Sequence, residues 1–396
     1  MLTILDHKNI NMTCKKCESP RTVILRKKDY YCDDCFMVST HHKFRACIGK
    51  NKVLSPNENV LIGLSGGVGS TVLLDLVHHG ISLDNTKKLR IVPLFIHLFD
   101  DTSRDLAESV IKQSQKYNFN VYIVHLAVYM SKNFQLPEVN CIPDVAENER
   151  IVFLEMINSM PPSAASDFLL KIKRNLLVEY AKQLKCKVVF TAETTNTLAI
   201  NLLSNLAIGR GSQVQNDIGF CDARDENVKI IKPIKDISNE ELNFYVDIKQ
   251  LTPVYYRNIK NNSLQSVISA FVSDLQDNFQ ATISTVCKTA DKIGDQNNEY
   301  KMSERCIICE SFLHTKNMKL SALEATNVSK TVSFGNTQLK QDLINNPDLL
   351  NNLDEVNPSM FPLIHKYLCY GCSRNHSEMN QTKLPLHIQK ILNLKS

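Results

Sequence analysis

Eight of the thirteen cysteines in this chain fall into Cys-x-x-Cys pairs. The pairs are Cys14/Cys17, Cys32/Cys35, Cys306/Cys309 and Cys369/Cys372. Two thiolates three positions apart on a tight turn can both reach one tetrahedral metal ion, and two such pairs complete a four-cysteine zinc site. Sites of this kind have no open position for a substrate, so the pattern predicts structural zinc rather than catalytic zinc.

The spacing between the pairs suggests how they combine. The first two pairs are separated by 14 residues, close to the roughly 15–20 of common zinc modules, and we expect segment 21–31 between them to form a hairpin. The last two pairs are 59 residues apart. We expect them to share one metal too, and Gly371 suits the unusual backbone angles of a metal-binding knuckle. The alternative is that these cysteines are small buried side chains or redox pairs.

A glycine-rich segment, Ser65-Gly66-Gly67-Val68-Gly69-Ser70, has the composition of a phosphate loop. It follows the apolar run 60–64, which has the length of a strand, and precedes apolar residues at helical spacing over 72–77. Backbone N–H groups and the helix dipole at such a turn favour an anion. The candidate nucleotide-binding residues are Ser65, Gly66, Gly67 and Ser70. The segment lacks the Gly-Lys-Ser/Thr of a Walker A loop, and a plain tight turn is the alternative.

The elements that must position this loop alternate along the chain. Apolar runs predict strands at 91–97, 121–126 and 188–191, and helical patterns occupy 103–117, 167–185 and 197–208. Alternation of this kind predicts an α/β fold with a parallel sheet and helices on both faces. Ligands bind at the carboxyl ends of the strands in such sheets, which is where the loop at 65–70 would lie.

Length and composition narrow the class of protein. The 396 residues suffice for about two or three domains, and a hydrophobic content of 43% allows a sizeable core. A formal net charge of +5 permits contact with nucleic acid without requiring it. We expect a cytoplasmic protein with no membrane contact, because the N-terminus lacks an apolar signal region and no apolar run approaches the ~18 residues of a membrane span.

The order of these motifs resembles one protein family. Ser-Gly-Gly-x-x-Ser after a strand is similar to the loop of the PP-loop ATP pyrophosphatases, which adenylate substrates and include tRNA thiolases. The cysteine pairs, Ala207-Ile208-Gly209-Arg210-Gly211, Ile231-Lys232-Pro233-Ile234-Lys235 and Glu240-Glu241 together resemble the cytoplasmic tRNA 2-thiolation protein 2 family. The resemblance runs from Cys14 to Cys372. It implies a PP-loop (adenine nucleotide alpha hydrolase-like) fold flanked by N-terminal and C-terminal four-cysteine zinc-binding elements.

The resemblance also implies a function. The family acts in 2-thiolation of the wobble uridine (mcm5s2U) in cytoplasmic tRNAs for Lys, Glu and Gln. The chain would form a heterodimer with a second PP-loop protein, the catalytic thiolase subunit, and would contribute to tRNA binding. The sulfur would come from a thiocarboxylated ubiquitin-related carrier protein.

Three departures from active thiolases predict that this chain is a largely non-catalytic subunit. Active members carry Asp at the fifth loop position, where this chain has Gly69. Their Gly-His-Asn-x-Asp-Asp-like stretch corresponds to 191–197, which contains no Asp pair to hold Mg²⁺. Of their two sulfur-handling cysteines, Cys141 is the one candidate here, and an isolated cysteine is more often a small buried hydrophobe. Whether ATP still binds is left open.

Basic side chains offer a surface for RNA, since Lys and Arg neutralise phosphates. We predict tRNA contacts from Lys43 and Arg45 beside the first zinc module, and from Arg174 and Arg210 on or after later helices. The alternative is that these residues belong to solvated helix faces.

We expect three regions along the chain. They are a zinc ribbon at 1–50, a PP-loop domain at 51–250 with an insertion near 127–165, and a C-terminal region at 251–396. The last holds the second zinc site and a partly disordered insertion near 315–360. Two other functions compete with the first: an active ATP-dependent tRNA sulfurtransferase, and a zinc-stabilised RNA-binding protein unconnected with sulfur.

Overall fold

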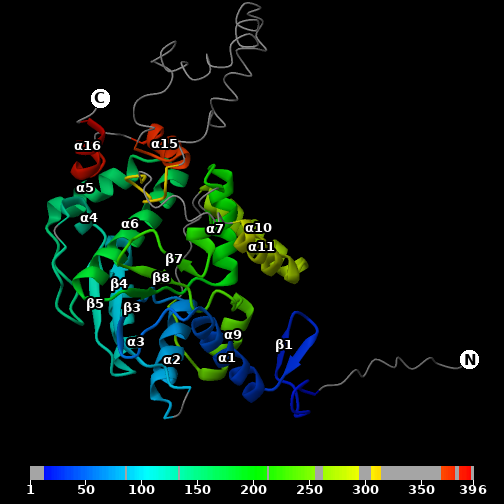
Figure 1. The fold of residues 1–396 in the computed structure, drawn as a ribbon. Helices are drawn as coiled ribbons and strands as arrows, with labels where there is room; N and C mark the ends of the chain where they lie inside the picture. Colours follow the sequence, from blue (N-terminus) through cyan, green and yellow to red (C-terminus); the bar gives the residue numbers. More distant parts are fainter. Residues whose placement is uncertain are drawn as a thin grey trace, which may run out of the picture. The chain divides into compact units, whose positions relative to one another are not determined.

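The computed structural model describes most of the chain (Figure 1). The described residues are 13–84, 87–132, 134–211, 214–254, 262–293, 305–313, 367–379 and 383–393. They form two compact units, one of residues 1–207 and 211–295, the other of 208–210 and 296–396. The three regions expected from the sequence stay a prediction, and the expected insertion near 315–360 lies outside the described residues.

The first unit is built on a six-stranded sheet in the order β5-β4-β3-β6-β8-β7. The strands are β3 (Glu58–Gly63), β4 (Ile91–Phe99), β5 (Val121–His125), β6 (Val188–Phe190), β7 (Cys221–Asp222) and β8 (Lys229–Ile231). All neighbours are parallel except β7, which runs antiparallel to β8. The predicted parallel sheet is confirmed. The short strands β7 and β8 were not predicted, because two or three residues carry no periodic pattern.

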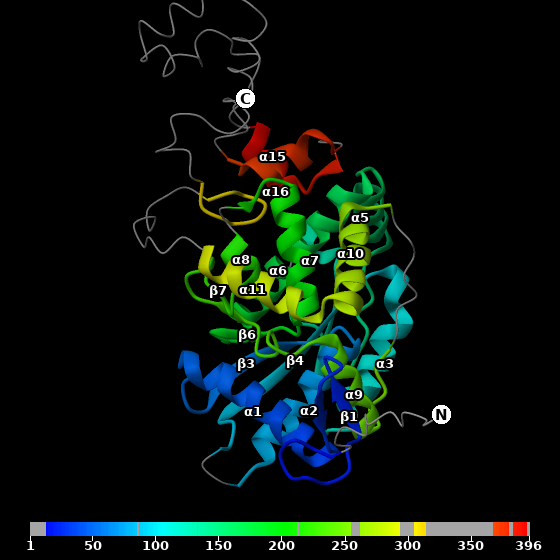
Figure 2. The same cartoon turned by 90° about the vertical axis from the view of Figure 1, so that its right-hand side faces the viewer.

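Helices cover both faces of this sheet. Their bounds are α1 (Asp33–Asn51), α2 (Val68–Ser82), α3 (Arg104–Gln115), α4 (Val128–Ser131), α5 (Glu147–Asn158), α6 (Pro162–Gln183), α7 (Thr195–Ala207), α8 (Val214–Ile218), α9 (Asn239–Lys249), α10 (Leu264–Asn278) and α11 (Gln280–Ile293), with a 3₁₀ turn η1 (Asp101–Ser103). Figure 2 shows α1, α2 and α9 on one side of the sheet and α6 and α7 on the other. The segment expected as an insertion at 127–165 contains α4, α5 and the start of α6.

The chain order of the strands fixes where a ligand would bind. From β3 the sheet continues to β4 on one side and to β6 on the other. Such a reversal opens a crevice outside the carboxyl ends of the strands. The residues that connect β3 to α2, 64–67, lie at that end.

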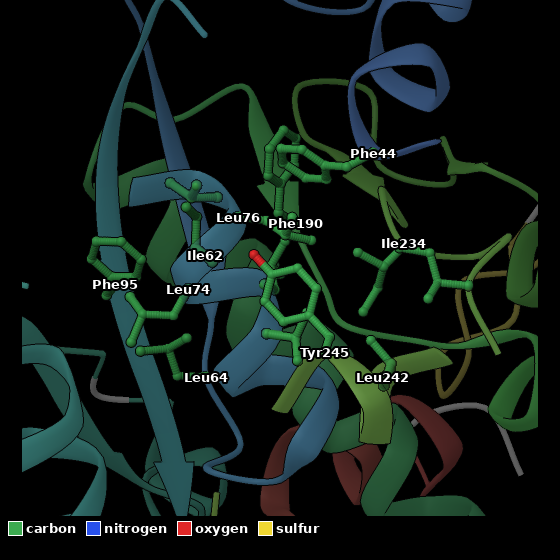
Figure 3. Packing of buried hydrophobic residues seen from close by; sticks show 14 of the residues in the cluster. Phe44, Ile62, Leu64, Leu74, Leu76, Phe95, Phe190, Ile234, Leu242 and Tyr245 are labelled. Carbon is green, nitrogen blue, oxygen red and sulfur yellow. The ribbon is translucent and has the colours of Figure 1, made fainter. Parts of the chain in front are cut away.

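A large apolar core lies between the sheet and the helices α1, α2 and α9 on one of its faces. Ile62 of β3, Phe95 of β4 and Phe190 of β6 pack with Leu74 of α2 and Tyr245 of α9 (Figure 3). The same cluster includes side chains from the N-terminal module, which comprises residues 13–51. They are Val23, Leu25, Phe36 and Phe44. The N-terminal module is therefore part of the first unit.

The N-terminal module contains the predicted hairpin. Strands β1 (Val23–Leu25) and β2 (Asp29–Tyr31) pair antiparallel, directly before α1. The second unit contributes α15 (Tyr370–Ser377) and α16 (Leu386–Asn393). In the part of the chain that the structure describes, no helix has the length and apolarity needed to cross a membrane.

Candidate functional site

The N-terminal cysteine cluster combines a tight turn with a helix start. Cys14 and Cys17 lie on the turn, and Cys32 is the N-cap residue of α1, with Cys35 in its first turn. All four sulfur atoms lie within 4.8 Å of one another, and the Sγ atoms of Cys17 and Cys32 are 3.4 Å apart. The structure therefore brings together the four residues that the sequence grouped.

The environment of Cys14 favours the thiolate, which is the form that binds metals. Burial raises the pKa of the Cys14 thiol, but hydrogen bonds outweigh this effect and lower its pKa to about 6. The backbone N–H of Lys16 donates to Cys14 Sγ at 3.4 Å and is the foremost of these bonds.

The C-terminal cluster repeats the same construction. Cys306 and Cys309 lie on a turn, and Cys369 is the N-cap residue of α15, with Cys372 in its first turn. The four sulfur atoms again lie within 4.8 Å of one another. The Sγ atoms of Cys309 and Cys369 are 3.6 Å apart. Two pairs separated by 59 residues in the sequence thus form one cluster.

The two turns share a six-residue sequence, Cys-x-x-Cys-Glu-Ser, at 14–19 and 306–311. In each, the first Cys N–H donates to the Ser carbonyl and the Glu N–H donates back to the first Cys carbonyl. The glutamates Glu18 and Glu310 adopt left-handed φ angles of 61° and 58°. This hexapeptide is a short internal repeat of the chain, visible in the sequence once the residues after the cysteines are compared as well.

The role expected for Gly371 was wrong. The unusual backbone angle of the C-terminal knuckle lies at Glu310, whereas Gly371 belongs to α15 and has no positive φ. Gly371 is needed for a different reason, a close approach of the backbone described below.

Both clusters fit a single tetrahedral ion. A zinc–sulfur distance of 2.3 Å places the corners of a regular tetrahedron about 3.8 Å apart. The two sulfur–sulfur distances given above, 3.4 and 3.6 Å, and the 4.8 Å limit bracket that value. Each cluster can therefore hold one metal ion with four thiolate ligands.

The glycine loop at the carboxyl end of β3 is held by its own hydroxyl groups. Ser70 is buried and donates to Gly67 O at 3.1 Å, and Ser65 Oγ lies 3.1 Å from Ser70 Oγ. Gly66 has a φ of +83°, and a Cβ there would lie 2.6 Å from a Leu106 methyl group. The four residues predicted from the sequence thus share one compact turn, with Ser65 exposed to solvent.

Gly69 is built into this turn by close packing. A Cβ at position 69 would lie 2.9 Å from the carbonyl oxygen of Ala192, which follows β6. That distance is shorter than Cβ–oxygen contacts in proteins, so a side chain here requires the backbone to move. The aspartate of active PP-loop enzymes is therefore absent from the sequence and also without space at this position.

The stretch 191–197 beside the loop also lacks metal-binding character. The Thr194 hydroxyl donates to Asn239 Oδ1 at 2.8 Å, and the Thr195 hydroxyl donates to Lys235 O at 2.8 Å. Glu193 supplies the one carboxylate of the stretch. A single carboxylate does not replace the pair that holds Mg²⁺ at transferring phosphates.

Three ionisable side chains near the loop were not singled out by the sequence. His97 of β4 is fully buried, and its Nδ1 lies 2.7 Å from Leu64 O. Burial lowers the pKa of His97 to about 4, so the ring is neutral at pH 7. Burial raises the pKa of Asp100, but hydrogen bonds from the Thr102 and Ser103 side chains and the charge of Lys173 lower it overall. Lys173 is exposed to solvent, and desolvation by the surrounding protein lowers the pKa of its amine.

The four predicted tRNA-contacting residues fall into two groups. Lys43 and Arg45 lie on α1 and are partly exposed, with Lys43 paired to Glu241. Arg174 is 8% exposed and donates to Asp222 Oδ2 at 2.7 Å, and Arg210 is 3% exposed. A phosphate cannot reach a guanidinium enclosed in this way, so Arg174 and Arg210 do not suit the predicted role.

Comparisons with known proteins agree with this geometry. Residues 263–374 match the family model described as cytoplasmic tRNA 2-thiolation protein 2. The chain is 30% identical over 387 residues to the protein of that name from Drosophila simulans. The match covers 94% of this chain and 92% of that protein. It is 28% identical over 384 residues to the protein of the same name from Danio rerio, with 82% of this chain and 77% of that protein covered.

A solved structure supports the fold class. A U34-tRNA thiolase from Methanococcus maripaludis, solved with its 4Fe–4S cluster, superposes with a TM-score of 0.58 at 21% sequence identity. The match covers 76% of this chain and 97% of that chain. This likeness confirms the predicted PP-loop α/β fold.

Proposed function

Because this chain belongs to the cytoplasmic tRNA 2-thiolation protein 2 family, we propose that it acts as a subunit of the complex that 2-thiolates the wobble uridine of cytoplasmic tRNAs. The proposed tRNAs are those for Lys, Glu and Gln. Its proposed partner is a catalytic PP-loop thiolase, with sulfur supplied by a thiocarboxylated ubiquitin-related carrier protein. The names of its relatives support a cytoplasmic location.

The observation that carries a non-catalytic role is the packing at Gly69. A side chain there would collide with Ala192 O, and stretch 191–197 offers one carboxylate where metal-dependent adenylation needs a pair. The chain therefore contributes its fold and surfaces to the complex, while its partner performs adenylation and sulfur transfer.

The loop itself remains suited to an anion. The start of α2, where backbone N–H groups favour an anion, follows the carboxyl end of β3, and Ser65 beside it is exposed. Lys173 adds an exposed cation whose charge acts on His97, and the His97 ring contacts Leu64 O. A phosphate or nucleotide held here would stabilise the fold without being activated.

Zinc is the metal proposed for both clusters. Four thiolates around one ion satisfy its preferred tetrahedral geometry and leave no open coordination position. When bound, zinc would stabilise the turns and helix starts that carry Cys14, Cys32, Cys306 and Cys369.

The N-terminal hairpin is the proposed tRNA-contacting surface, together with Arg45. Its tip places Arg26 and Lys27 at left-handed φ angles of 52° and 57°, and Lys28 follows them. All three side chains are exposed. Asn and Gly are the residues favoured at such a turn, so two cations in these positions carry a conformational cost that phosphate binding explains.

Reconstitution tests this proposal. The purified chain, its PP-loop partner, and both together are assayed for ATP-dependent 2-thiolation of a wobble-uridine tRNA. We expect full thiolation activity only when both proteins are present, and at most a small fraction of that activity from the partner by itself. Thiolation by the isolated chain favours the alternative of an active sulfurtransferase. Binding of tRNA without any effect on thiolation favours an RNA-binding protein unconnected with sulfur.

A further inference from the structure

A buried arginine contacts the C-terminal cysteine cluster. Arg210 Nη2 donates to Cys372 Sγ at 3.3 Å. The arginine lies in segment 208–210, which the chain contributes to the second unit nearly a hundred residues before the cysteines of that cluster. It is 3% exposed, so its charge is shielded from water and depends on its neighbours.

Two glycines make this contact sterically allowed. Gly209 has a φ of +81°, and a Cβ there would lie 2.4 Å from the ring of Tyr370. A Cβ at Gly371 would lie 2.7 Å from Arg210 Cγ and 3.1 Å from Ile208 O. The backbones of the two segments approach each other because neither glycine carries a side chain. This approach brings the guanidinium to the sulfur.

The contact would compensate the negative charge of a metal-loaded cluster. Four thiolates around one divalent ion carry a net charge of −2, which is costly to bury without compensation. A guanidinium offsets part of that charge, and its N–H group holds the orientation of the thiolate that it contacts. A neutral cluster of buried cysteines gains nothing comparable from a buried cation.

We propose that Arg210 is a positioning residue of the C-terminal metal centre. It holds the Cys372 thiolate by a charge-assisted hydrogen bond and compensates the charge of the loaded site. This inference rests on the proposed zinc centre, and its test separates the two.

The test measures zinc affinity of the full chain by competition with a chelator. Two zinc-release transitions are expected, one for each cluster, and Cys17→Ser removes the transition that belongs to the N-terminal cluster. Arg210→Gln should weaken the remaining transition by about 10–100-fold, the usual effect of removing a hydrogen bond to a metal ligand. Arg210→Lys retains the charge without the planar fork and should lose less.

The matched control is Arg374→Gln. Arg374 lies on α15, two residues after Cys372, but its side chain is 58% exposed and pairs with Glu378 at 4.0 Å. Arg374→Gln removes an equal charge from the helix that carries Cys372 without touching a thiolate, so zinc affinity should stay at the wild-type value.

Cobalt provides a readout that loss of packing alone does not move. In the Co²⁺-loaded chain, loss of the hydrogen bond should shift the thiolate-to-cobalt charge-transfer band of the C-terminal site to lower energy in Arg210→Gln. Unchanged affinity and an unchanged band in Arg210→Gln would overturn the role of Arg210 while leaving the zinc centre intact. Failure of the wild-type C-terminal cluster to take up either metal would overturn both.

Discussion

Gly69 shows how a single residue bears on catalysis. The aspartate found at this position in active PP-loop enzymes is missing, and Ala192 O lies only 2.9 Å from where the Cβ of any side chain would be placed. The missing carboxylate is therefore accompanied by close packing of the turn against Ala192. Restoring one carboxylate to this chain does not restore the space that the carboxylate needs.

We predict that Gly69→Asp destabilises the chain and leaves it inactive. Overpacking of this kind costs about 1–3 kcal/mol, measured as a lower midpoint in urea unfolding. Gly67→Ala is the control, because a Cβ at Gly67 would meet only Ser65 Oγ, at 3.7 Å. A Gly69→Asp chain that unfolds at the wild-type midpoint and adenylates tRNA would contradict the proposed steric exclusion of a side chain at position 69.

The duplicated Cys-x-x-Cys-Glu-Ser turn is the feature that matters at the scale of elements. Each copy is followed, locally or much later in the chain, by a helix whose N-cap and first turn carry the other two cysteines. Short strands such as β1 and β2 have little stability of their own. A metal ion bound by the four cysteines would therefore hold a turn, a hairpin and a helix start together at the N-terminus.

We predict that Cys17→Ser releases this N-terminal element and spares the sheet. The chain should lose one zinc ion, and hydrogen exchange should rise in peptides covering 21–35 while β3 and β4 remain protected. Cys141→Ser is the control, since Cys141 is exposed and belongs to neither cluster. Uniform deprotection of the whole first unit would show instead that the metal supports the entire core.

At the scale of the whole molecule, a net charge of +5 matters through its distribution. Arg174 is enclosed with Asp222, whereas Arg26, Lys27 and Lys28 project from the tip of the hairpin. Exposed cations release counterions when they meet phosphates, so they make binding depend on salt. The hairpin is thus the part of the described surface that we assign to tRNA.

We predict that Arg26→Asn/Lys27→Gly weakens tRNA binding by the reconstituted complex without harming the fold. Asn-Gly suits the left-handed turn, so thermal stability should be equal or higher. The slope of log K against log salt concentration should become shallower by about 1 to 2, as expected for two lost phosphate contacts. Lys112→Ala/Lys116→Ala, in the last turn of α3 and directly after it, removes equal charge elsewhere. An equal change of slope in that control would argue against a contact specific to the hairpin.

The amino-acid sequence by itself determined the parallel α/β sheet, the glycine loop and the two four-cysteine groups. Strand and helix periodicity, glycine placement and Cys-x-x-Cys spacing are local patterns, and each reports on a few consecutive residues. Gly69 was visible as a missing carboxylate in the same way.

Only the tertiary structure decided which basic residues face solvent and why certain glycines are present. Arg174 and Arg210 look alike in sequence to any surface arginine, but Asp222 and Cys372 enclose them after folding. Gly371 was assigned to a backbone angle and instead makes room for Arg210. Burial and close approach depend on residues far apart in the chain, and no local pattern contains that information.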